Sequence, residues 1–320
     1  MKEKYREWFQ IGSLAFEVEA NFSLCEWLWE PQPYNLWINY MLTDISQPIK
    51  IFHIWLLNEL QKEVTVNCSD KNLEVMGDFS CMEEAGYNQQ FGLFGNKGIL
   101  NQYLLHTIEV ELGATIFHGC SVRNPLDGRV LIGIGASGSG KSTFISCAVQ
   151  QGWELLSTEY TIIDTQLRLW NANHYDNVSP VTAEYIEKDL KEAVVYKNKR
   201  LMSPLGQKIF VDMRRYANTD LGHPIVPSSV GIVLLDFGNQ KIKKQPLEDR
   251  DFFLRILQIF GSEKINSPII FSNQIYEAPL HGNPVIRSEI IQKIIENCNC
   301  KYILGGIQDD FEQYLRFEYR

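Results

Sequence analysis

The chain has 320 residues, enough for one large or two ordinary domains with hydrophobic cores. Hydrophobic residues make up 45% and charged residues 22%, which argues against disordered, collagen-like and coiled-coil proteins. The net charge of −9 argues against a polyanionic partner, and we find no basic stripe of the kind that binds nucleic acid.

Nothing in the sequence predicts a membrane or export segment. Met1–Glu7 is charged and leads into no apolar run of signal-peptide length. No stretch approaches the roughly 20 apolar residues that span a bilayer. The seven cysteines lack Cys-x-x-Cys spacing, and the closest pair is Cys298 and Cys300. We therefore expect a cytoplasmic protein with reduced, mostly buried thiols.

The first hundred residues are rich in tryptophan and have the pattern of strands. Leu14–Glu19 alternates apolar and polar residues, and Asn35–Tyr40 does so with aromatic and β-branched residues. Ile51–Leu60 fits a strand or a helix, and Gly86–Gly98 is predicted to be loop. We predict a β-rich domain over residues 1–100, which recognises a substrate or braces its neighbour.

From about Asn101, long apolar strands alternate with helical patterns, and we predict a second, α/β domain over residues 101–320. Its first two strands, Ile116–Val122 and Arg129–Ile134, flank a proline- and Asp-Gly-containing segment typical of a hairpin turn. Antiparallel pairing of Arg123 with Arg129 puts His118 opposite Gly133 or Ile134. His118 would then lie beside the segment that follows, although a lone histidine on an apolar strand is usually only packed.

That following segment fits G-x-x-x-x-G-K-[ST] at every fixed position. It comprises Gly135, Ala136, Ser137, Gly138, Ser139, Gly140, Lys141 and Ser142, with Thr143 next to it. An apolar strand precedes it, and Phe144–Val149 has helical spacing after it. Glycines let the backbone wrap a phosphate, and the helix amino terminus adds unpaired N–H donors. We predict a nucleotide site here; the alternative is a glycine-rich turn that binds nothing.

Each polar residue of this loop has an expected task. Lys141 would bridge the β- and γ-phosphates of ATP, and the Ser142 hydroxyl would hold Mg²⁺. Thr143 would reach the α-phosphate. Downstream, Val230–Leu235 and Asp236 suggest a transporter-type ATPase, but the signature sequence of that class is missing. A plain strand ending in a turn explains this segment better.

A second crossover places a carboxylate near the loop. The helix from Lys141 leads through Gly152 into the predicted strand Glu154–Ser157. If that strand is parallel to the one before the loop, Thr158 and Glu159 emerge at the same sheet edge. Glu159 is a candidate to hold Mg²⁺ and accept a proton, with Asp164 as a further carboxylate; the alternative is a surface turn residue.

The carboxyl-terminal residues are expected to cover the sheet. Helical spacing puts Ile290, Ile291, Ile294 and Ile295 of Glu289–Asn297 on one face. A short strand at Lys301–Leu304, a turn at Gly305-Gly306 and a helix at Asp309–Glu318 follow.

Phe117-His118-Gly119, the loop, its helix and Gly152–Glu159 together resemble the nucleotide domain of HPr kinase/phosphorylase and its relatives, including kinases that phosphorylate lasso-peptide precursors. The similarity is sharp over about residues 115–165. It implies an α/β fold of the HPr kinase or phosphoenolpyruvate carboxykinase type, with a phosphate loop in a mixed sheet. It also implies His118, Lys141 and Glu159 as catalytic residues, Ser142 and Glu159 as metal ligands, and ATP and Mg²⁺ as cofactors.

The sequence departs from that family at two places. The family carries two aspartates where this chain has Thr158-Glu159. Its downstream segment of Glu, Arg and glycines is not found in Lys197–Arg215, so HPr is disfavoured as the acceptor. That stretch instead contains basic residues that could clamp phosphates or an anionic acceptor, or lie exposed. They are Lys199, Arg200, Arg214 and Arg215.

The first hypothesis is a kinase that transfers the γ-phosphoryl group to a serine-like hydroxyl of a peptide or small metabolite. The second is a nucleotide-binding regulatory module without transfer. A third, nucleotide hydrolysis coupled to a partner, lacks supporting signatures. The sequence does not decide between ATP and GTP, and a homo-oligomer is suggested only by the resemblance.

Overall fold

The computed structural model describes most of the chain. The described residues are 4–24, 41–42, 50–69, 71–80, 93, 95, 98–203, 206–217, 223–239, 244–263, 265, 269–271, 274–276, 280, 282–298 and 300–319. Two compact units emerge. The first consists of Met1–Leu112, Leu221–His223 and Lys264–Asn283, and the second of Gly113–Asp220, Pro224–Glu263 and Pro284–Arg320. Residue 100, the predicted boundary, falls at the start of helix α3 (Ile99–Glu111).

A six-stranded mixed sheet forms much of the first unit, with strand order β3-β1-β2-β4-β6-β5. Its strands are β1 (Tyr5–Ile11), β2 (Leu14–Ala20), β3 (Met41–Leu42), β4 (Lys50–Asn58), β5 (Thr65–Ser69) and β6 (Asn72–Gly77). Strands β1 and β2 are antiparallel, whereas β4 is parallel to both β2 and β6. A short hairpin, β17 (Ile269–Phe271) and β18 (Gln274–Tyr276), also belongs to this unit.

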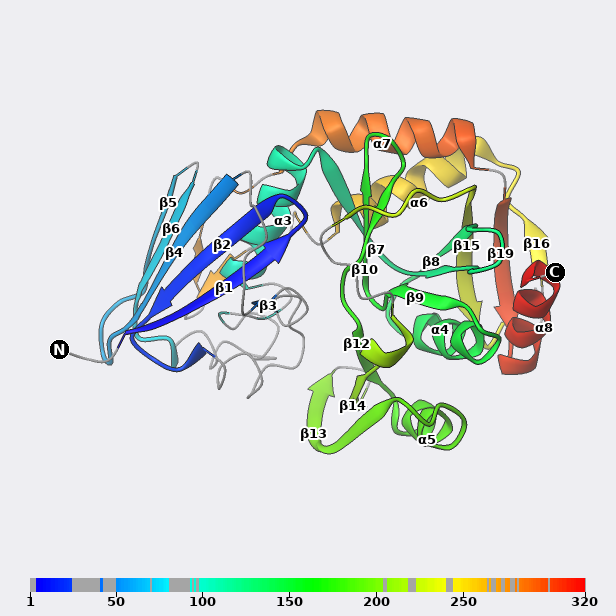
Figure 1. Ribbon diagram of the computed structural model, residues 1–320, viewed down its shortest axis with the longest axis horizontal. Coiled ribbons are helices and arrows are strands. Elements are labelled where there is room, and N and C mark those ends of the chain that lie inside the picture. Colours follow the sequence, from blue (N-terminus) through cyan, green and yellow to red (C-terminus); the bar gives the residue numbers. More distant parts are fainter. Residues whose placement is uncertain are drawn as a thin grey trace. The chain divides into compact units, whose positions relative to one another are not determined.

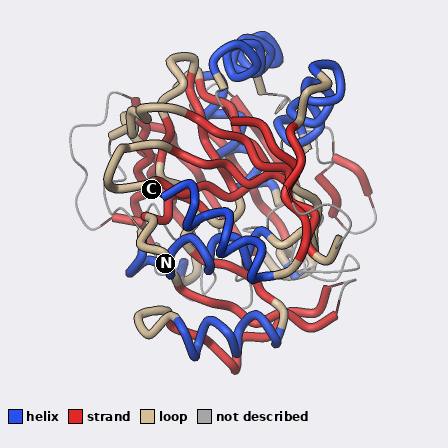
Figure 2. Tube along the Cα trace, turned by 90° about the vertical axis from the view of Figure 1, so that its right-hand side faces the viewer, coloured by secondary structure: helices blue, strands red, loops and turns tan. Residues whose placement is uncertain are grey.

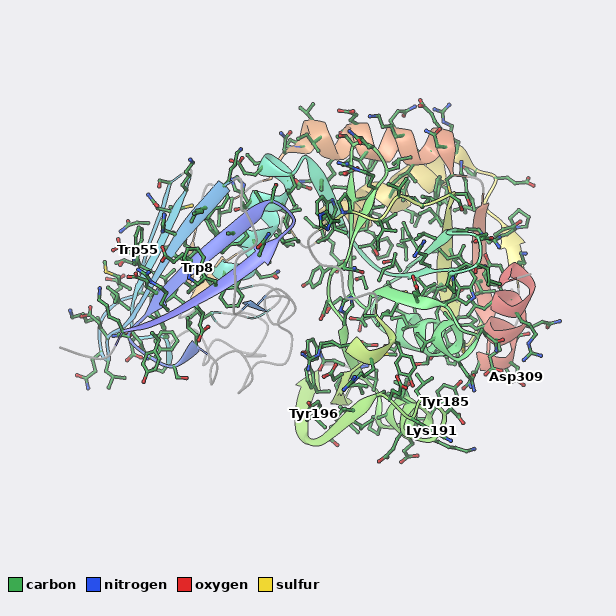
Figure 3. All side chains as sticks on the ribbon, in the orientation of Figure 1. Trp8, Trp55, Tyr185, Lys191, Tyr196 and Asp309 are labelled. Carbon is green, nitrogen blue, oxygen red and sulfur yellow. The ribbon has the colours of Figure 1, made fainter. Side chains whose placement is uncertain are left out.

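The two faces of this sheet differ. Phe16 and Phe52 pack edge-on against Tyr103 of α3, with ring centroids 6.4 and 6.5 Å away. Side chains alternate between the faces of a strand, so Trp8 and Trp55 lie on the opposite face (Figure 3). The two described tryptophans of this unit therefore stay outside the core between the sheet and α3.

Two of the predicted strands lie in this sheet. Leu14–Glu19 is confirmed as part of β2, and Ile51–Leu60, left open between strand and helix, is largely β4. The predicted strand Asn35–Tyr40 lies outside the described residues, as does most of the predicted loop Gly86–Gly98.

The second unit is mixed α/β, as predicted, and is built on an eight-stranded sheet. Along the sheet the order is β11-β10-β7-β8-β15-β19-β16, with β9 paired to β7. The strands are β7 (Ala114–Arg123), β8 (Val130–Ile134), β9 (Glu154–Ser157), β10 (Tyr160–Asp164), β11 (Leu169–Trp170), β15 (Val230–Phe237), β16 (Lys244–Pro246) and β19 (Cys300–Gly306). Strand β8 is parallel to β15 and antiparallel to β7.

Helices cover both faces of this sheet (Figures 1 and 2). They are α4 (Lys141–Gln150), α6 (Arg250–Ser262), α7 (Pro284–Asn297) and α8 (Gln308–Tyr319). Leu131 of β8 packs in a core with α4 and α8, whereas Val130, Ile132 and Ile134 pack in a core with α6 and α7. Burial on both faces explains why β8 is apolar throughout instead of alternating.

A three-stranded antiparallel sheet extends the second unit beyond β9. It consists of β12 (Tyr175–Val178), β13 (Val194–Ser203) and β14 (Gly206–Asp212), in the order β12-β14-β13. Ser179 precedes helix α5 (Pro180–Asp189), and its side chain accepts a hydrogen bond from the Thr182 amide. The 3-10 helix η2 (Arg214–Tyr216) follows β14.

Several local predictions for this unit are confirmed and two are wrong. The helices at 289–297 and 309–318 lie within α7 and α8, and the four isoleucines of α7 are buried. The turn predicted at Gly305-Gly306 is instead the end of β19, which continues to Gly306 beside β15.

The predicted hairpin register is also wrong, by one residue. Arg123 pairs with Val130, because the turn closes with a hydrogen bond from the Asn124 amide to the Arg129 carbonyl oxygen. Gly119, not His118, therefore pairs with Ile134. His118 lies one residue further along, level with the start of the phosphate loop.

None of the described helices has the length and the apolar character that crossing a membrane requires.

Candidate functional site

The predicted phosphate loop, residues 135–140, connects β8 to α4, in the order that the sequence predicted. Gly138 and Gly140 have φ of 86° and 96°, so the chain turns back tightly before the helix begins at Lys141. The Lys141 ammonium group donates hydrogen bonds to the carbonyl oxygens of Gly135 at 2.6 Å and Ala136 at 3.1 Å. Its positive charge therefore lies over the loop, next to the amino terminus of α4, where anions bind favourably.

The loop rests on two phenylalanines from other elements. Phe237, at the end of β15, donates a backbone hydrogen bond to the Ser139 carbonyl oxygen at 3.0 Å. Its ring meets Phe311 of α8 edge-on at 5.6 Å, and Phe311 meets Phe144 of α4 at 6.2 Å. This packing fixes the loop against the sheet and the helix that flank it.

His118 and Glu159 lie together at the same sheet edge as the loop. Strand β7 has β8 on one side and β10 on the other, with Tyr160 paired to His118. The Gly119 amide donates to the Glu159 carbonyl oxygen at 3.0 Å. Strand β9 is antiparallel to β7 and so runs in the same direction as β8. The predicted emergence of Glu159 beside the loop follows from this arrangement.

His118 is held between two carboxylates, one of which sequence reasoning missed. Its Nε2 lies 3.9 Å from Glu159 Oε1, and its Nδ1 lies 2.7 Å from Glu263 Oε2. Glu263 directly follows α6 and is 145 residues from His118, so no spacing pattern could connect the two. The imidazole can orient Glu159 and is itself oriented by Glu263.

Thr158 stands next to Glu159 but does not serve as a site residue. Its side chain is buried, and its hydroxyl oxygen lies 2.9 Å from the Asn173 carbonyl oxygen and 2.6 Å from that of Tyr175. The Thr158 amide also donates to Asn173. Thr158 therefore ties the end of β9 to the chain that enters β12.

Asp176 of β12, the residue after this tether, faces the loop and was also missed. The Ser142 hydroxyl lies near its carboxyl group and acts on its charge. Its Oδ1 accepts from the Asn177 amide at 2.8 Å, while Oδ2 is buried without a hydrogen bond among the described residues. Burial raises the pKa of Asp176, as does the nearby Glu159, whereas Ser142, Asn177 and Lys141 lower it.

Lys141, Ser142, Glu159 and Asp176 therefore lie near one another, where the loop meets the start of α4. No sequence signal marks Asp176, because Tyr175-Asp176-Asn177 fits no binding pattern. Hydroxyl and carboxylate oxygens are the donors that Mg²⁺ prefers. In the described parts of the chain, no three His, Cys, Asp or Glu side chains form a metal cage. A pair of carboxylates with a hydroxyl suits a magnesium ion that completes its shell with phosphates and water.

Other predicted residues have structural partners. Asp164 accepts hydrogen bonds from the backbone of Gln166 and Arg168 and pairs with the Arg168 guanidinium at 2.7 Å, so it holds a turn. Arg214 pairs with Asp212 at 2.8 Å and lies 5.0 Å above the Tyr175 ring. Since Tyr175 and Asp176 point to opposite faces of β12, Arg214 lies away from Asp176.

Arg215 is exposed, and the side chains of Lys199 and Arg200 lie outside the described part. Asp236, the second-last residue of β15, is exposed, and the Asn239 side chain donates to it at 2.7 Å.

His174 lies between Asn173 and Tyr175, the two residues whose carbonyl oxygens face Thr158. It makes the stability of the folded chain sensitive to acid. Its Nε2 donates to the Leu156 carbonyl oxygen at 3.1 Å, and burial lowers its pKa to about 4. The unfolded chain protonates this histidine below about pH 6.5, but the folded chain does so only near pH 4. The folded state therefore loses stability as the pH falls through this window, and the loss levels off below it.

We expect the free energy of unfolding to fall by about 2 kcal/mol between pH 7.5 and pH 5 because of His174 alone. Urea denaturation at several pH values measures this slope in wild type, in His174→Gln and in a control, His223→Gln, at an exposed position. Wild type and the control should share the slope, and His174→Gln should be flatter. Equal slopes in all three proteins would show that His174 is not responsible.

No protein-family model matches this chain, and no curated protein sequence matches it.

Proposed function

We propose that this protein is a magnesium-dependent kinase that transfers the γ-phosphoryl group of ATP to a hydroxyl group of a peptide or small metabolite. One observation carries the proposal: the loop with Lys141 and Ser142 lies at the same sheet edge as Glu159 and His118. Phosphoryl transfer needs a phosphate cradle and a positioned carboxylate side by side.

The residues divide the work as follows. Backbone N–H groups of the loop and of the first turn of α4 bind the phosphates, and Lys141 neutralises their charge. Ser142 and Glu159 are the protein's ligands for Mg²⁺, which screens the charge that develops on the phosphate oxygens when it is bound. Glu159 also accepts the proton of the acceptor hydroxyl. The hydroxyl oxygen then attacks the γ-phosphorus, the bond to the β-phosphate oxygen breaks, and ADP leaves. His118, between Glu159 and Glu263, keeps the Glu159 carboxylate oriented.

The resemblance of residues 115–165 to HPr kinase/phosphorylase supports this reading and suggests a domain of that type. It does not suggest HPr as the acceptor, since the Glu-Arg-glycine segment of that family has no counterpart here. The geometry is equally compatible with GTP as donor, because no described contact is specific for a base.

One observation favours the second candidate, a nucleotide-binding regulatory module. The hydroxyl of Thr158, at a position where the resembling family has an aspartate, is engaged with two backbone carbonyl groups. A site with one carboxylate fewer could bind nucleotide without transferring the phosphoryl group.

Mass spectrometry of a lysate from the source organism tests the proposal. The lysate is incubated with MgATP and purified wild type, Lys141→Ala, or Lys191→Ala, an exposed lysine substituted as control. Wild type and Lys191→Ala should add a phosphoryl group to the same peptide or metabolite, and Lys141→Ala should not. Clear ATP binding by wild type without any such product would favour the regulatory module.

A further inference from the structure

We propose that Asp176 supplies the second carboxylate of this site and acts with Ser142 in holding the magnesium ion, while Thr158 only positions it. The proposal rests on the nucleotide site of the proposed function and goes beyond it by assigning a residue from another strand. Neither the phosphate-loop pattern nor the resemblance points to β12.

Position 158 does not suit a carboxylate. Its side chain faces the carbonyl oxygens of Asn173 and Tyr175, to which a hydroxyl can donate and a carboxylate cannot. An ionised group at this buried position would face two acceptors without a donor, which is strongly unfavourable. The threonine is thus suited to a tether, and the charge has to come from elsewhere.

Asp176, in contrast, has both a carboxyl group near the loop residues and an oxygen without a hydrogen bond among the described residues. The bond from Thr158 to the Tyr175 carbonyl oxygen places Asp176 beside the Thr158-Glu159 segment. Ser142, Lys141 and Glu159 all lie close enough to its carboxyl group to act on its charge. In phosphate-loop enzymes the loop serine or threonine and an aspartate hold Mg²⁺ together. The buried Oδ2 has no hydrogen bond among the described residues, so this strong acceptor still lacks the donor or cation that burial demands.

The backbone holds Asp176 in this place from two sides. Thr158 anchors the chain at Tyr175, immediately before it, and β14 pairs with β12 so that Asp176 lies opposite Val211. Preorganisation of this kind keeps a metal-binding carboxylate in place before the metal arrives.

Asp236 is the alternative that strand order would suggest, because it lies near the carboxyl end of β15, which is parallel to β8 and paired with it. Its carboxylate, however, is exposed and accepts a hydrogen bond from Asn239 in the same turn. Ser142 acts on the charge of Asp176, and Asp236 therefore serves as a matched control.

Metal and nucleotide titrations test the assignment without any acceptor. Binding of ADP in EDTA is measured by calorimetry, and binding of Mn²⁺ to the ADP complex by electron paramagnetic resonance. Asp176→Asn should weaken Mn²⁺ binding about tenfold to hundredfold. Its affinity for ADP in EDTA should stay equal or increase, because a negative charge near the phosphates is removed. Asp236→Asn should match wild type in both measurements.

Unchanged Mn²⁺ affinity in Asp176→Asn, or a loss in Asp236→Asn instead, would overturn the assignment of Asp176 and leave the kinase proposal standing. Failure of wild type to bind ADP with or without metal would overturn both. If Asp176→Asn does not fold, Asp176→Ser keeps an oxygen but removes the charge, and the same loss of Mn²⁺ binding is expected.

Discussion

Glu159→Gln is expected to lower acceptor phosphorylation by about a thousandfold, the effect of losing a positioned general base. Glutamine keeps the size of the side chain and an oxygen toward the metal, but it cannot take the proton of the acceptor hydroxyl. ATP should remain bound, since the proposed phosphate contacts come from the loop and Lys141. Turnover is measured with the acceptor found in the lysate, and ATP binding by calorimetry.

Glu154→Gln is the matched control, because Glu154 begins the strand after which Glu159 lies and pairs with Arg123 at 3.0 Å, away from the loop. It should turn over like wild type. If Glu159→Gln retained wild-type turnover, Glu159 would not be the base, and another group would have to accept the proton.

Gly140→Ala is expected to weaken ATP binding by about tenfold to a hundredfold, the equivalent of about 1–3 kcal/mol of backbone strain in the loop. A side chain at φ of 96° is strained in itself. In addition, an alanine Cβ would lie 2.5 Å from Phe237 Cβ and 3.2 Å from the Phe311 ring. Because Phe237 also holds Ser139, relief of the clash would shift the loop backbone that we propose binds the phosphates.

Gly238→Ala separates these two effects. Gly238 has φ of 87°, but an alanine Cβ there would meet nothing within 4 Å. It should cost stability from backbone strain alone and leave ATP affinity near that of wild type. Equal loss of ATP binding in both variants would mean that strain, and not packing against Phe237, decides how well the loop binds phosphate.

The sequence alone was sufficient to predict those parts of the candidate site whose residues are contiguous in the chain. The order of β8, loop and α4 follows from a run of residues whose glycines, lysine and flanking apolar patterns are all local. The edge at which Glu159 emerges could also be predicted, because the direction of a strand after a helical crossover follows general rules. Nucleotide binding itself stays a prediction.

The residues that sequence reasoning missed come from distant parts of the chain. Glu263 reaches His118 from the end of α6, and Asp176 reaches Ser142 because Thr158 holds the entry to β12. Neither placement has a periodic or motif signature. The predicted hairpin register was wrong by one residue. Arg129 accepts a hydrogen bond from the Asn124 amide at the turn, so Arg123 pairs with Val130 instead of Arg129.

The first unit is made of three stretches of chain, Met1–Leu112, Leu221–His223 and Lys264–Asn283, so no single cut releases it. Within it, the Asn283 amide donates to Glu109 of α3 at 2.7 Å, and the Gly282 amide donates to His106 at 3.1 Å. An expression clone that started at Gly113 would keep residues 264–283 and remove the helix to which they bond. Exchange of this unit between proteins, by recombination or in the laboratory, therefore has to transfer all three stretches together.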